Sequence, residues 1–431
     1  MALTRPAPSK NGKQHDGDGP EKSRPAAQLW RLLDSPAASY YLILGSTIAL
    51  TLLGLVMVLS ASSVEAYDGG KGSSFSVFLR QAAFAAAGIP LMFIASRVPL
   101  WFWKKIAWGL LIVGLLVQLL PFTPLGAESH GNKSWIRIGS FQAQPAEAGK
   151  LALVLWLGVV LAAKQKLLGQ WKHVAIPIVP VVGLMLMFVL LGDDLGTGLI
   201  FMILVLGALF VAGVPLRMFG VAGVGLALVA VLLAISSPNR MARISSLFGG
   251  NSATSDYSGQ DWQSTHGMWA LASGGWWGVG LGASREKWQW LPEAHNDFIY
   301  AIIGEELGLP GTLGVLVLFM ILGLALLRVV RRSTDLMVKV TTGAVFAWII
   351  AQAVINIGVV LSLFPVIGVP LPLVSYGGSA LLTTLAALGI VLSFARAEAG
   401  ASAAMAQQAH QVRRSLAVLG RRRAQREGKR R

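Results

Sequence analysis

The sequence predicts an all-α polytopic membrane protein with ten transmembrane helices. Of its 431 residues, 54% are hydrophobic and only 13% are charged, whereas a soluble domain carries about a quarter charged residues. The apolar residues form long uncharged blocks, such as Val181–Leu191 and Leu199–Val214, which approach the roughly 20 residues needed to cross a bilayer. This composition excludes a soluble enzyme, and the absence of cysteine excludes a disulfide-stabilised secreted scaffold.

Each span is expected between breaks formed by charged residues, proline and glycine. The ten expected helices lie near residues 40–62, 78–96, 101–120, 147–163, 174–191, 196–213, 217–236, 297–326, 340–362 and 372–395. Only the short segment Gly192–Leu195 separates the fifth helix from the sixth, so these two should form a tight hairpin. An even number of spans places both termini on the same side of the membrane.

The basic residues predict which side is cytoplasmic. They concentrate in the two tails and in four short loops, at Arg97, Lys104, Lys105, Lys164, Lys166, Lys172, Arg217, Arg328, Arg331, Arg332 and Lys339. The positive-inside rule therefore places both termini in the cytoplasm, with basic tails 1–39 and 396–431 flanking a membrane domain at 40–395. The net charge of +16 then reflects orientation and anionic lipid rather than a nucleic-acid partner.

Two segments predicted to face outward are longer than simple connectors. They are 121–146 and the loop at 237–296, which joins the seventh and eighth helices. Loops of this length are usually functional or disordered, and the second is rich in glycine and in tryptophan, at Trp262, Trp269, Trp276, Trp277, Trp288 and Trp290. This composition predicts an ordered loop. Its tryptophans fit an interfacial aromatic belt, or a membrane-hugging cover for a lipid tail or sugar.

Asp297 is the strongest candidate for chemistry. It lies in a polar cluster, Leu291–Tyr300, at the expected start of the eighth helix. Polar residues at membrane depth are costly and usually functional, and a positioned carboxylate can act as a general base on a hydroxyl. The alternative is that Asp297 merely caps the helix. Glu305 and Glu306 point elsewhere around that helix, and we expect them to pair with basic or polar groups.

Further candidates lie in three other clusters. Glu147 and Lys150 are three residues apart on one helical face and can pair, either in solvent or beneath a loop that contains Trp135. Cationic side chains in the 237–296 loop suit phosphate oxygens, or alternatively lipid headgroups, and they are Arg240, Arg243 and Lys287. Ser375 belongs to a segment rich in proline and glycine, which suits either a cavity lining or a kinked turn.

At these residues the chain resembles the SEDS (shape, elongation, division and sporulation) family of peptidoglycan glycosyltransferases. Pro292–Phe298 resembles the family's Pro-Glu-x-His-x-Asp-Phe block, and Gly304–Gly308 resembles its Gly-Glu-Glu-Leu-Gly continuation. Other segments resemble its Gln-Pro-x-Glu-x-x-Lys block, its paired arginines and the segment that carries its Ser-Tyr-Gly-Gly signature; they are Gln144–Lys150, Arg240 with Arg243, and Pro365–Ala380. Ala294 before His295 is more similar to the division branch than to the elongation branch.

The resemblance implies polymerisation of lipid II into β(1→4) glycan at the outer face of the bacterial cytoplasmic membrane, with Asp297 as the catalytic residue. A division role implies location at the septum, and the family implies a class B penicillin-binding protein as partner, FtsI-like, besides other division proteins. A divalent cation, Mg2+ or Mn2+, is a candidate cofactor. The candidates for substrate binding are Trp135, Glu147, Lys150, Arg240, Arg243, Gln263, Lys287, His295 and Ser375.

Two other functions suit a chain of this kind: a flippase that transports the same lipid, and a division scaffold without activity. A transporter should place ionisable residues near the midplane of several helices. Here such residues gather at the predicted outer ends of the fourth, seventh and eighth helices. This placement favours chemistry at the membrane surface.

Overall fold

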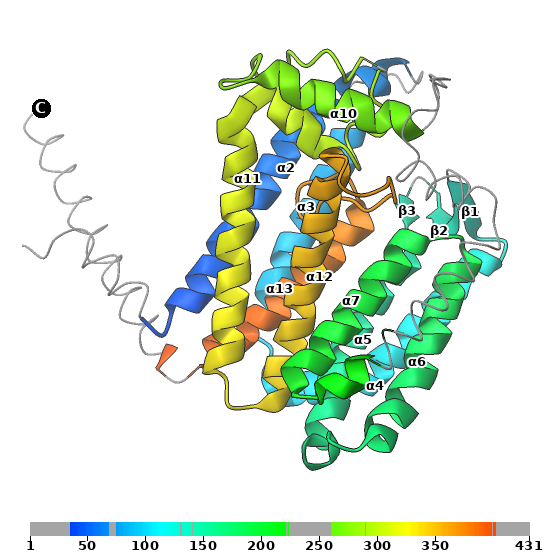
Figure 1. Cartoon of the computed structure of the whole chain (residues 1–431), viewed down its shortest axis with the longest axis vertical. Helices are drawn as coiled ribbons and strands as arrows, with labels where there is room; N and C mark the ends of the chain where they lie inside the picture. The colour runs from blue at the N-terminus through cyan, green and yellow to red at the C-terminus, as the bar shows by residue number, and fades with distance from the viewer. Residues whose placement is uncertain are drawn as a thin grey trace, which may run out of the picture.

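The computed structural model describes residues 35–68, 75–129, 132–139, 141–220, 223, 260–288, 290–398 and 400–401, which are mostly helical (Figure 1). Within these residues, nine helices are long and apolar enough to cross a membrane. They are α2 (Ala38–Asp68), α3 (Ser76–Ala95), α4 (Leu100–Val117), α5 (Pro145–Ala163), α6 (Trp171–Leu191), α7 (Leu195–Ala212), α11 (Ile299–Arg332), α12 (Leu336–Val360) and α13 (Gly378–Arg396).

These helices confirm that the chain is a multi-pass membrane protein. The hairpin predicted around Gly192–Leu195 is confirmed between α6 and α7. The tenth predicted span, at 217–236, lies almost wholly outside the described residues, so the count of ten stays a prediction. The beginning of α2 and the end of α13 lie at one end of the bundle, because Arg328 Nη2 donates to Ser35 O at 3.0 Å and Arg332 Nη1 lies 3.3 Å from Glu398 Oε1. An even number of spans requires this arrangement.

The opposite end of the bundle has two additional layers, and we call it the α10 end. Helix α10 (Gln260–Gly274) lies across the tops of the spans, as Figure 1 shows. The same end of the bundle also carries a small antiparallel sheet of order β1-β2-β3, formed by Gly126–Ser129, Asn132–Ile138 and Phe141–Ala143. Helix α10 confirms that part of the predicted long loop is ordered.

The sheet contradicts the prediction of an entirely helical chain. Strand β2 alternates between its two faces, so that Ile136 is buried while its neighbour Trp135 is only partly buried. Such alternation is the pattern of a half-buried strand. The sheet is fixed to the bundle because Lys133 N and Ser134 Oγ both donate to Gly192 O, at 3.1 Å and 3.0 Å.

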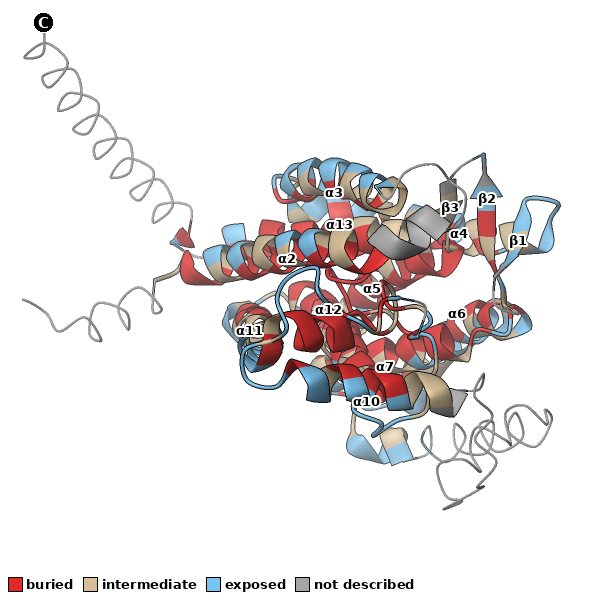
Figure 2. Cartoon of the chain, turned by 90° about the horizontal axis from the view of Figure 1, so that it is seen from above, coloured by how far each residue is buried: buried red, intermediate tan, exposed pale blue. Residues whose placement is uncertain are grey.

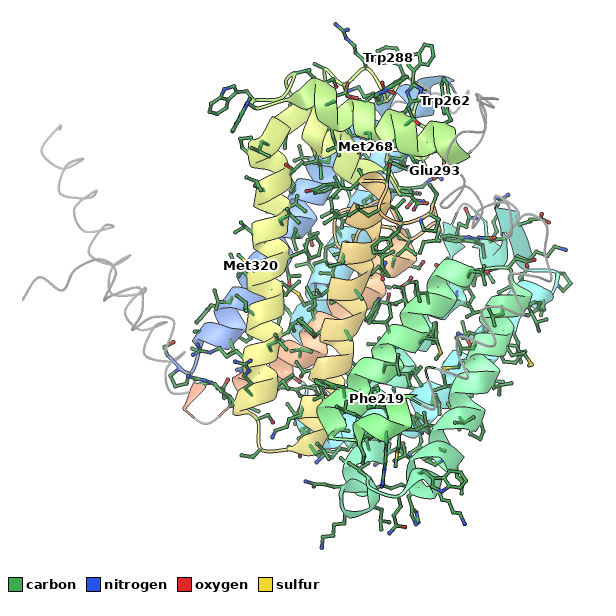
Figure 3. All side chains as sticks on the ribbon, in the orientation of Figure 1. Phe219, Trp262, Met268, Trp288, Glu293 and Met320 are labelled. Carbon is green, nitrogen blue, oxygen red and sulfur yellow. The ribbon has the colours of Figure 1, made fainter. Side chains whose placement is uncertain are left out.

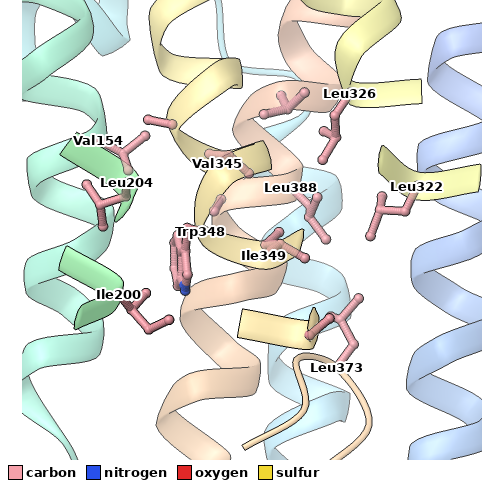
Figure 4. Packing of buried hydrophobic residues seen from close by; sticks show 14 of the residues in the cluster. Val154, Ile200, Leu204, Leu322, Leu326, Val345, Trp348, Ile349, Leu373 and Leu388 are labelled. Carbon is pink, nitrogen blue, oxygen red and sulfur yellow. The ribbon is translucent and has the colours of Figure 1, made fainter. Parts of the chain in front are cut away.

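The core centres on α12. In Figure 4 its side chains Val345 and Trp348 lie between Ile200 and Leu204 of α7 on one side and Leu322 and Leu326 of α11 on the other. Viewed from the α10 end, buried residues gather on α5, α12 and the inward faces of their neighbours (Figure 2). Helices α3, α4 and α6 instead expose much of their apolar surface, as expected of helices that contact lipid.

Helix α11 is broken near its beginning. Gly308 has φ 65° and ψ −158°, and Pro310 follows with no N–H to donate. The carbonyls left without helical partners are bound by the turn that follows α10: Val279 N donates to Glu305 O at 2.9 Å, and Gly280 N donates to Glu306 O at 3.1 Å. In return, Leu309 N donates to Gly275 O at 3.2 Å. This exchange satisfies backbone groups that a membrane-embedded helix cannot leave unpaired.

Close approach of α13 to α3 depends on glycine and gives a first prediction. A Cβ at Gly389 would lie 2.6 Å from Met92 O and 2.9 Å from Ala95 Cβ, whereas a Cβ at Gly109 of α4 would meet nothing within 4 Å. Overpacking typically costs about 1–3 kcal/mol. We therefore expect Gly389→Ala to lower the thermal unfolding temperature in detergent, while Gly109→Ala leaves it unchanged or raises it. Equal effects of the two substitutions would contradict close packing at Gly389.

Candidate active site at the α10 end

Asp297 lies in a tightly turned segment, 291–298, that leads into α11. Helix α11 has Phe298 as its N-cap, with no side chain capping it, so Asp297 lies one residue outside the helix and does not cap it. Its Oδ1 atom is fully covered, and no hydrogen bond within the described residues reaches that atom. Its Oδ2 atom faces Gly368, where a Cβ would lie only 3.7 Å away. A side chain longer than that of alanine at residue 368 would therefore crowd the carboxylate.

Three consecutive carbonyls hold this segment in place. His295 O accepts from Tyr376 N at 3.0 Å, Asn296 O accepts from Ser375 Oγ at 2.6 Å, and Asp297 O accepts from Asn356 Nδ2 at 2.8 Å. The donors come from α12 and from the loop 361–377 between α12 and α13. The last spans of the chain therefore set the position of the aspartate.

The donors are themselves supported. Asn356 Nδ2 also donates to Val369 O at 2.8 Å, and one turn earlier Gln352 Nε2 donates to Pro370 O at 2.9 Å. On the other side of the loop, Gln81 of α3 donates from Nε2 to Ser375 O at 3.1 Å and accepts from Gly377 N at 3.2 Å. Asn356, Gln352 and Gln81 were not among the predicted site residues, because a single amide in an apolar helix shows no distinctive spacing.

The surroundings of Asp297 favour its neutral form more than water does. The pKa of Asp297 is raised to about 7, mainly by burial and further by the nearby carboxylates of Glu293 and Asp194, while His295 partly opposes the shift. His295 is buried, with its ring centre 5.4 Å from that of Tyr376. Figure 3 shows Glu293 just beneath α10, near the end of α12. A carboxyl with a pKa near neutrality can both accept and return a proton.

A second polar cluster lies at the same end of the bundle. Lys150 Nζ and Glu147 Oε1 form an ion pair of 2.8 Å that is almost completely buried. Thr383 Oγ1 donates to Glu147 Oε2 at 3.3 Å, and Lys150 Nζ lies 4.8 Å from the centre of the Trp348 ring. The interpretation as a solvent-exposed pair is therefore wrong: α5, α12 and α13 enclose it.

Asp194 lies between the two clusters. It is the N-cap of α7 and accepts from Thr197 N at 2.9 Å, while Gln144 Nε2 donates to its Oδ2 at 2.5 Å. Burial raises the pKa of Asp194, and the charge of Lys150 partly opposes that shift. Since Asp194 in turn acts on Asp297, the two clusters form one electrostatic unit. The sequence indicated a turn at this position but gave no reason to place Asp194 in the site.

Lys287 lies in a third cluster, beside the break in α11. Its ammonium group contacts Glu306 Oε1 at 3.1 Å, Ser60 Oγ at 3.3 Å and Gly282 O at 2.7 Å. Glu305 accepts from Ser284 Oγ at 2.5 Å and from Arg285 N at 2.8 Å. The prediction that both glutamates pair with basic or polar groups is confirmed. In this conformation Lys287 fixes the loop to α2 and α11, and its predicted contact with substrate stays a prediction.

The remaining predicted residues lie elsewhere or outside the described chain. Trp135 lies on β2 opposite Ala127 of β1, and Gln263 lies on α10, partly exposed. Ser375 reaches the Asp297 segment through its hydroxyl. Arg240 and Arg243 lie outside the described residues. Among the residues that are described, no three potential metal-ligating side chains gather, so a divalent cation stays a prediction.

Two hollows adjoin these clusters. One, of about 270 Å³, is lined by Asp194 together with Ser134 and Gln118; the other, of about 250 Å³, is lined by Gln352 and by Ser375 with Tyr376. Asp297 is not among the residues that line these two hollows.

Fold and site together define a multi-pass membrane protein that keeps a titratable carboxylate near one membrane surface. The chain belongs to the SEDS family: a family model described as "Cell cycle protein", named after FtsW, RodA and SpoVE, matches residues 40–400. The chain is 36% identical to a probable peptidoglycan glycosyltransferase FtsW of Mycobacterium tuberculosis over 391 residues, which cover 90% of this chain and 74% of that protein. It is also 36% identical to stage V sporulation protein E of Bacillus subtilis, covering 81% of this chain and 95% of that protein.

Solved structures agree with this membership. A chain from a peptidoglycan synthase complex that coordinates polymerization and crosslinking superposes with a TM-score of 0.66 at 26% identity, covering 82% of this chain and 97% of that one. The rod shape determining protein RodA of Thermus thermophilus superposes with a TM-score of 0.60 at 25% identity, covering 83% and 97%. The predicted family is thus confirmed by sequence and by fold.

The bond from Asn356 to the aspartate gives a second prediction. Asn356→Ala leaves the carbonyls of Asp297 and Val369 without their donor, and an unsatisfied buried group costs about 1–3 kcal/mol. If the displaced carboxylate loses this much in the transition state, about 1.4 kcal/mol corresponds to tenfold in rate, and we expect a loss of activity of about fivefold to a hundredfold. Gln352→Ala is the matched control, because Gln352 supports the same loop but does not contact Asp297. Turnover by purified, monodisperse variants measures both, and equal losses would contradict a specific role for Asn356.

Proposed function

We propose that this chain is a peptidoglycan glycosyltransferase that polymerises lipid II into β(1→4) glycan strands at the outer face of the cytoplasmic membrane. The observation that carries the proposal is the covered carboxylate of Asp297, with its pKa raised to about 7. The family and the relatives named peptidoglycan glycosyltransferase support it. It requires the α10 end to face outward, as the distribution of basic residues predicts.

Asp297 is proposed as the general base. A sugar hydroxyl has a high pKa, so a carboxylate that removes its proton during attack raises the rate by a factor of about 10²–10⁴. The hydroxyl oxygen bonds to the anomeric carbon of the second lipid-linked sugar, and the proton passes to Asp297. The bond from that carbon to the phosphate oxygen breaks, and its electron pair leaves with the lipid pyrophosphate.

A single displacement inverts the anomeric centre, as conversion of an α-linked donor into a β(1→4) product requires. Inversion needs no covalent sugar–enzyme intermediate, so one carboxylate suffices and no second carboxylate at the short spacing of retaining enzymes is required. The negative charge that develops on the pyrophosphate requires cationic groups. Arg240 and Arg243 are the proposed source, since Lys150 and Lys287 are engaged in buried ion pairs. No step is assigned to a metal, because the described residues do not gather three ligands.

The same family membership supports a division role. We propose that the chain acts at the septum with a class B penicillin-binding protein, which crosslinks the strands that this chain makes. The similarity to a chain from a complex that coordinates polymerization and crosslinking supports such a partner. A flippase and an inactive scaffold are the competing functions, and a single assay separates them from the enzyme.

Asp297→Asn tests the base directly. Asparagine keeps the shape of the side chain but cannot accept a proton from the hydroxyl, so we expect a loss of at least about a hundredfold in polymer formation. Purified protein in liposomes with labelled lipid II gives the readout, with binding of lipid II and thermal stability as controls for folding. Wild-type polymer yield from the variant would refute the assignment. Translocation of labelled lipid without polymer would instead identify a flippase.

The pH dependence provides an independent test. A general base acts when it is ionised, so kcat/KM should rise as pH increases through about 7, where Asp297 loses its proton, and then reach a plateau. Glu293 raises the pKa of Asp297, and Glu293→Gln should therefore move the inflection to lower pH. Glu398→Gln, at the other end of the bundle, is the control and should leave the inflection in place. An inflection that is the same in all three proteins would show that another group controls it.

A further inference from the structure

The turn Gly275–Gly282 exposes two adjacent tryptophans that the proposed reaction does not use. Trp276 is 75% exposed and Trp277 is 84% exposed. Exposing this aromatic surface to water is unfavourable, because aromatic side chains are among those that gain most free energy from burial. The pair therefore indicates a surface that something apolar covers.

The turn is held firmly, so its exposure is not that of a loose loop. Its backbone binds both sides of the break in α11, through Val279 N to Glu305 O and through Leu309 N to Gly275 O. Glycine is required at the contact: a Cβ at Gly308 would lie 2.7 Å from the Trp277 carbonyl carbon and 2.8 Å from Trp276 O. The position of the tryptophan pair relative to α11 is thus fixed by backbone contacts.

The tryptophan pair lies beside the beginning of a row of exposed apolar side chains on α11. Beyond Gly308 the helix exposes apolar side chains at helical spacing, at Leu309, Leu313, Leu316, Val317, Met320 and Leu324. Met320, labelled on α11 in Figure 3, is 57% exposed. An apolar stripe on a membrane-spanning helix contacts acyl chains. The tryptophan pair continues this surface at the α10 end, where the hydrocarbon core must end.

We propose that Trp276 and Trp277 form a lipid-binding surface, inserted at the boundary between headgroups and acyl chains of the outer leaflet. Tryptophan prefers this level because its indole ring is apolar while its N–H remains near water. The occupant is lipid rather than protein, since the surface is continuous with the stripe of α11 that already faces lipid. Through the backbone contacts of the turn, this insertion holds α10 and the outer part of α11 at a defined depth.

The natural absence of cysteine allows a direct test. Trp277→Cys, or Trp276→Cys where the first does not fold, is labelled with a polarity-sensitive fluorophore. The full chain is then reconstituted in vesicles of phosphatidylethanolamine and phosphatidylglycerol. Lipids that carry a nitroxide near the headgroup should quench the label several-fold more than aqueous iodide does.

Two matched variants calibrate the depth. Trp288→Cys replaces a tryptophan that is 62% exposed and points away from the bundle in Figure 3, so iodide should quench its label and lipid nitroxides should not. Leu324→Cys lies farther along the stripe, 61% exposed, and should respond most to nitroxides deep in the acyl chain. If the label at 277 or 276 behaves like the label at 288, the proposal is overturned. Protection from iodide that arises only after a transpeptidase partner is added would also overturn it, in favour of a protein-binding surface.

Discussion

The site depends on the backbone of three consecutive residues, His295, Asn296 and Asp297. Each of their carbonyls accepts one hydrogen bond from the last hairpin of spans, through Tyr376 N, Ser375 Oγ and Asn356 Nδ2. A segment made of turns has no ladder of its own to fix it, so these three bonds do what a helix or sheet would otherwise do. The main chain of all three residues is thus fixed by hydrogen bonds, while Oδ1 of the Asp297 carboxylate accepts none from the described residues. A proton acceptor needs this combination of a fixed position and a free side chain.

The charged groups near the Asp297 carboxylate differ in their effect on its pKa. Glu147 and Lys150 neutralise one another in a buried pair, so together they add little field at a distance. Asp194 and Glu293 both raise the pKa of Asp297, in addition to its burial. Burial, reinforced by these two acidic groups, therefore holds the pKa of Asp297 near 7. Pairing of opposite charges and a raised carboxyl pKa both reduce the number of uncompensated charges, which explains why many ionisable groups are tolerated at one end of an apolar bundle.

Sequence reasoning predicted the membrane class and the approximate positions of the nine described spans, because long apolar blocks are visible without coordinates. It also selected the segment around Asp297 as a candidate site, because a polar cluster beside an apolar helix is visible in the same way. It missed the sheet, since strands as short as Phe141–Ala143 are hidden within a polar connector. It also missed the break in α11 at Gly308. The hydrogen bonds made by the side chains of Asn356 and Asp194 were missed as well. A lone amide or a capping carboxylate acquires meaning only from partners far along the chain, and periodicity carries no information about such partners. Asp297, which looked like a helix cap, proved to lie one residue before it.

The break in α11 is normally a place where a helix would flex. Here the turn that follows α10 binds the chain on both sides of Gly308, so the parts of α11 before and after the break keep a fixed angle. Membranes of different thickness tilt the helices that cross them. A change in the tilt of residues 309–332 is therefore transmitted through the turn Gly275–Gly282 to residues 299–307 and to Asp297, which precedes them. The composition of the surrounding lipid thereby becomes a determinant of how far the carboxylate lies above the hydrocarbon.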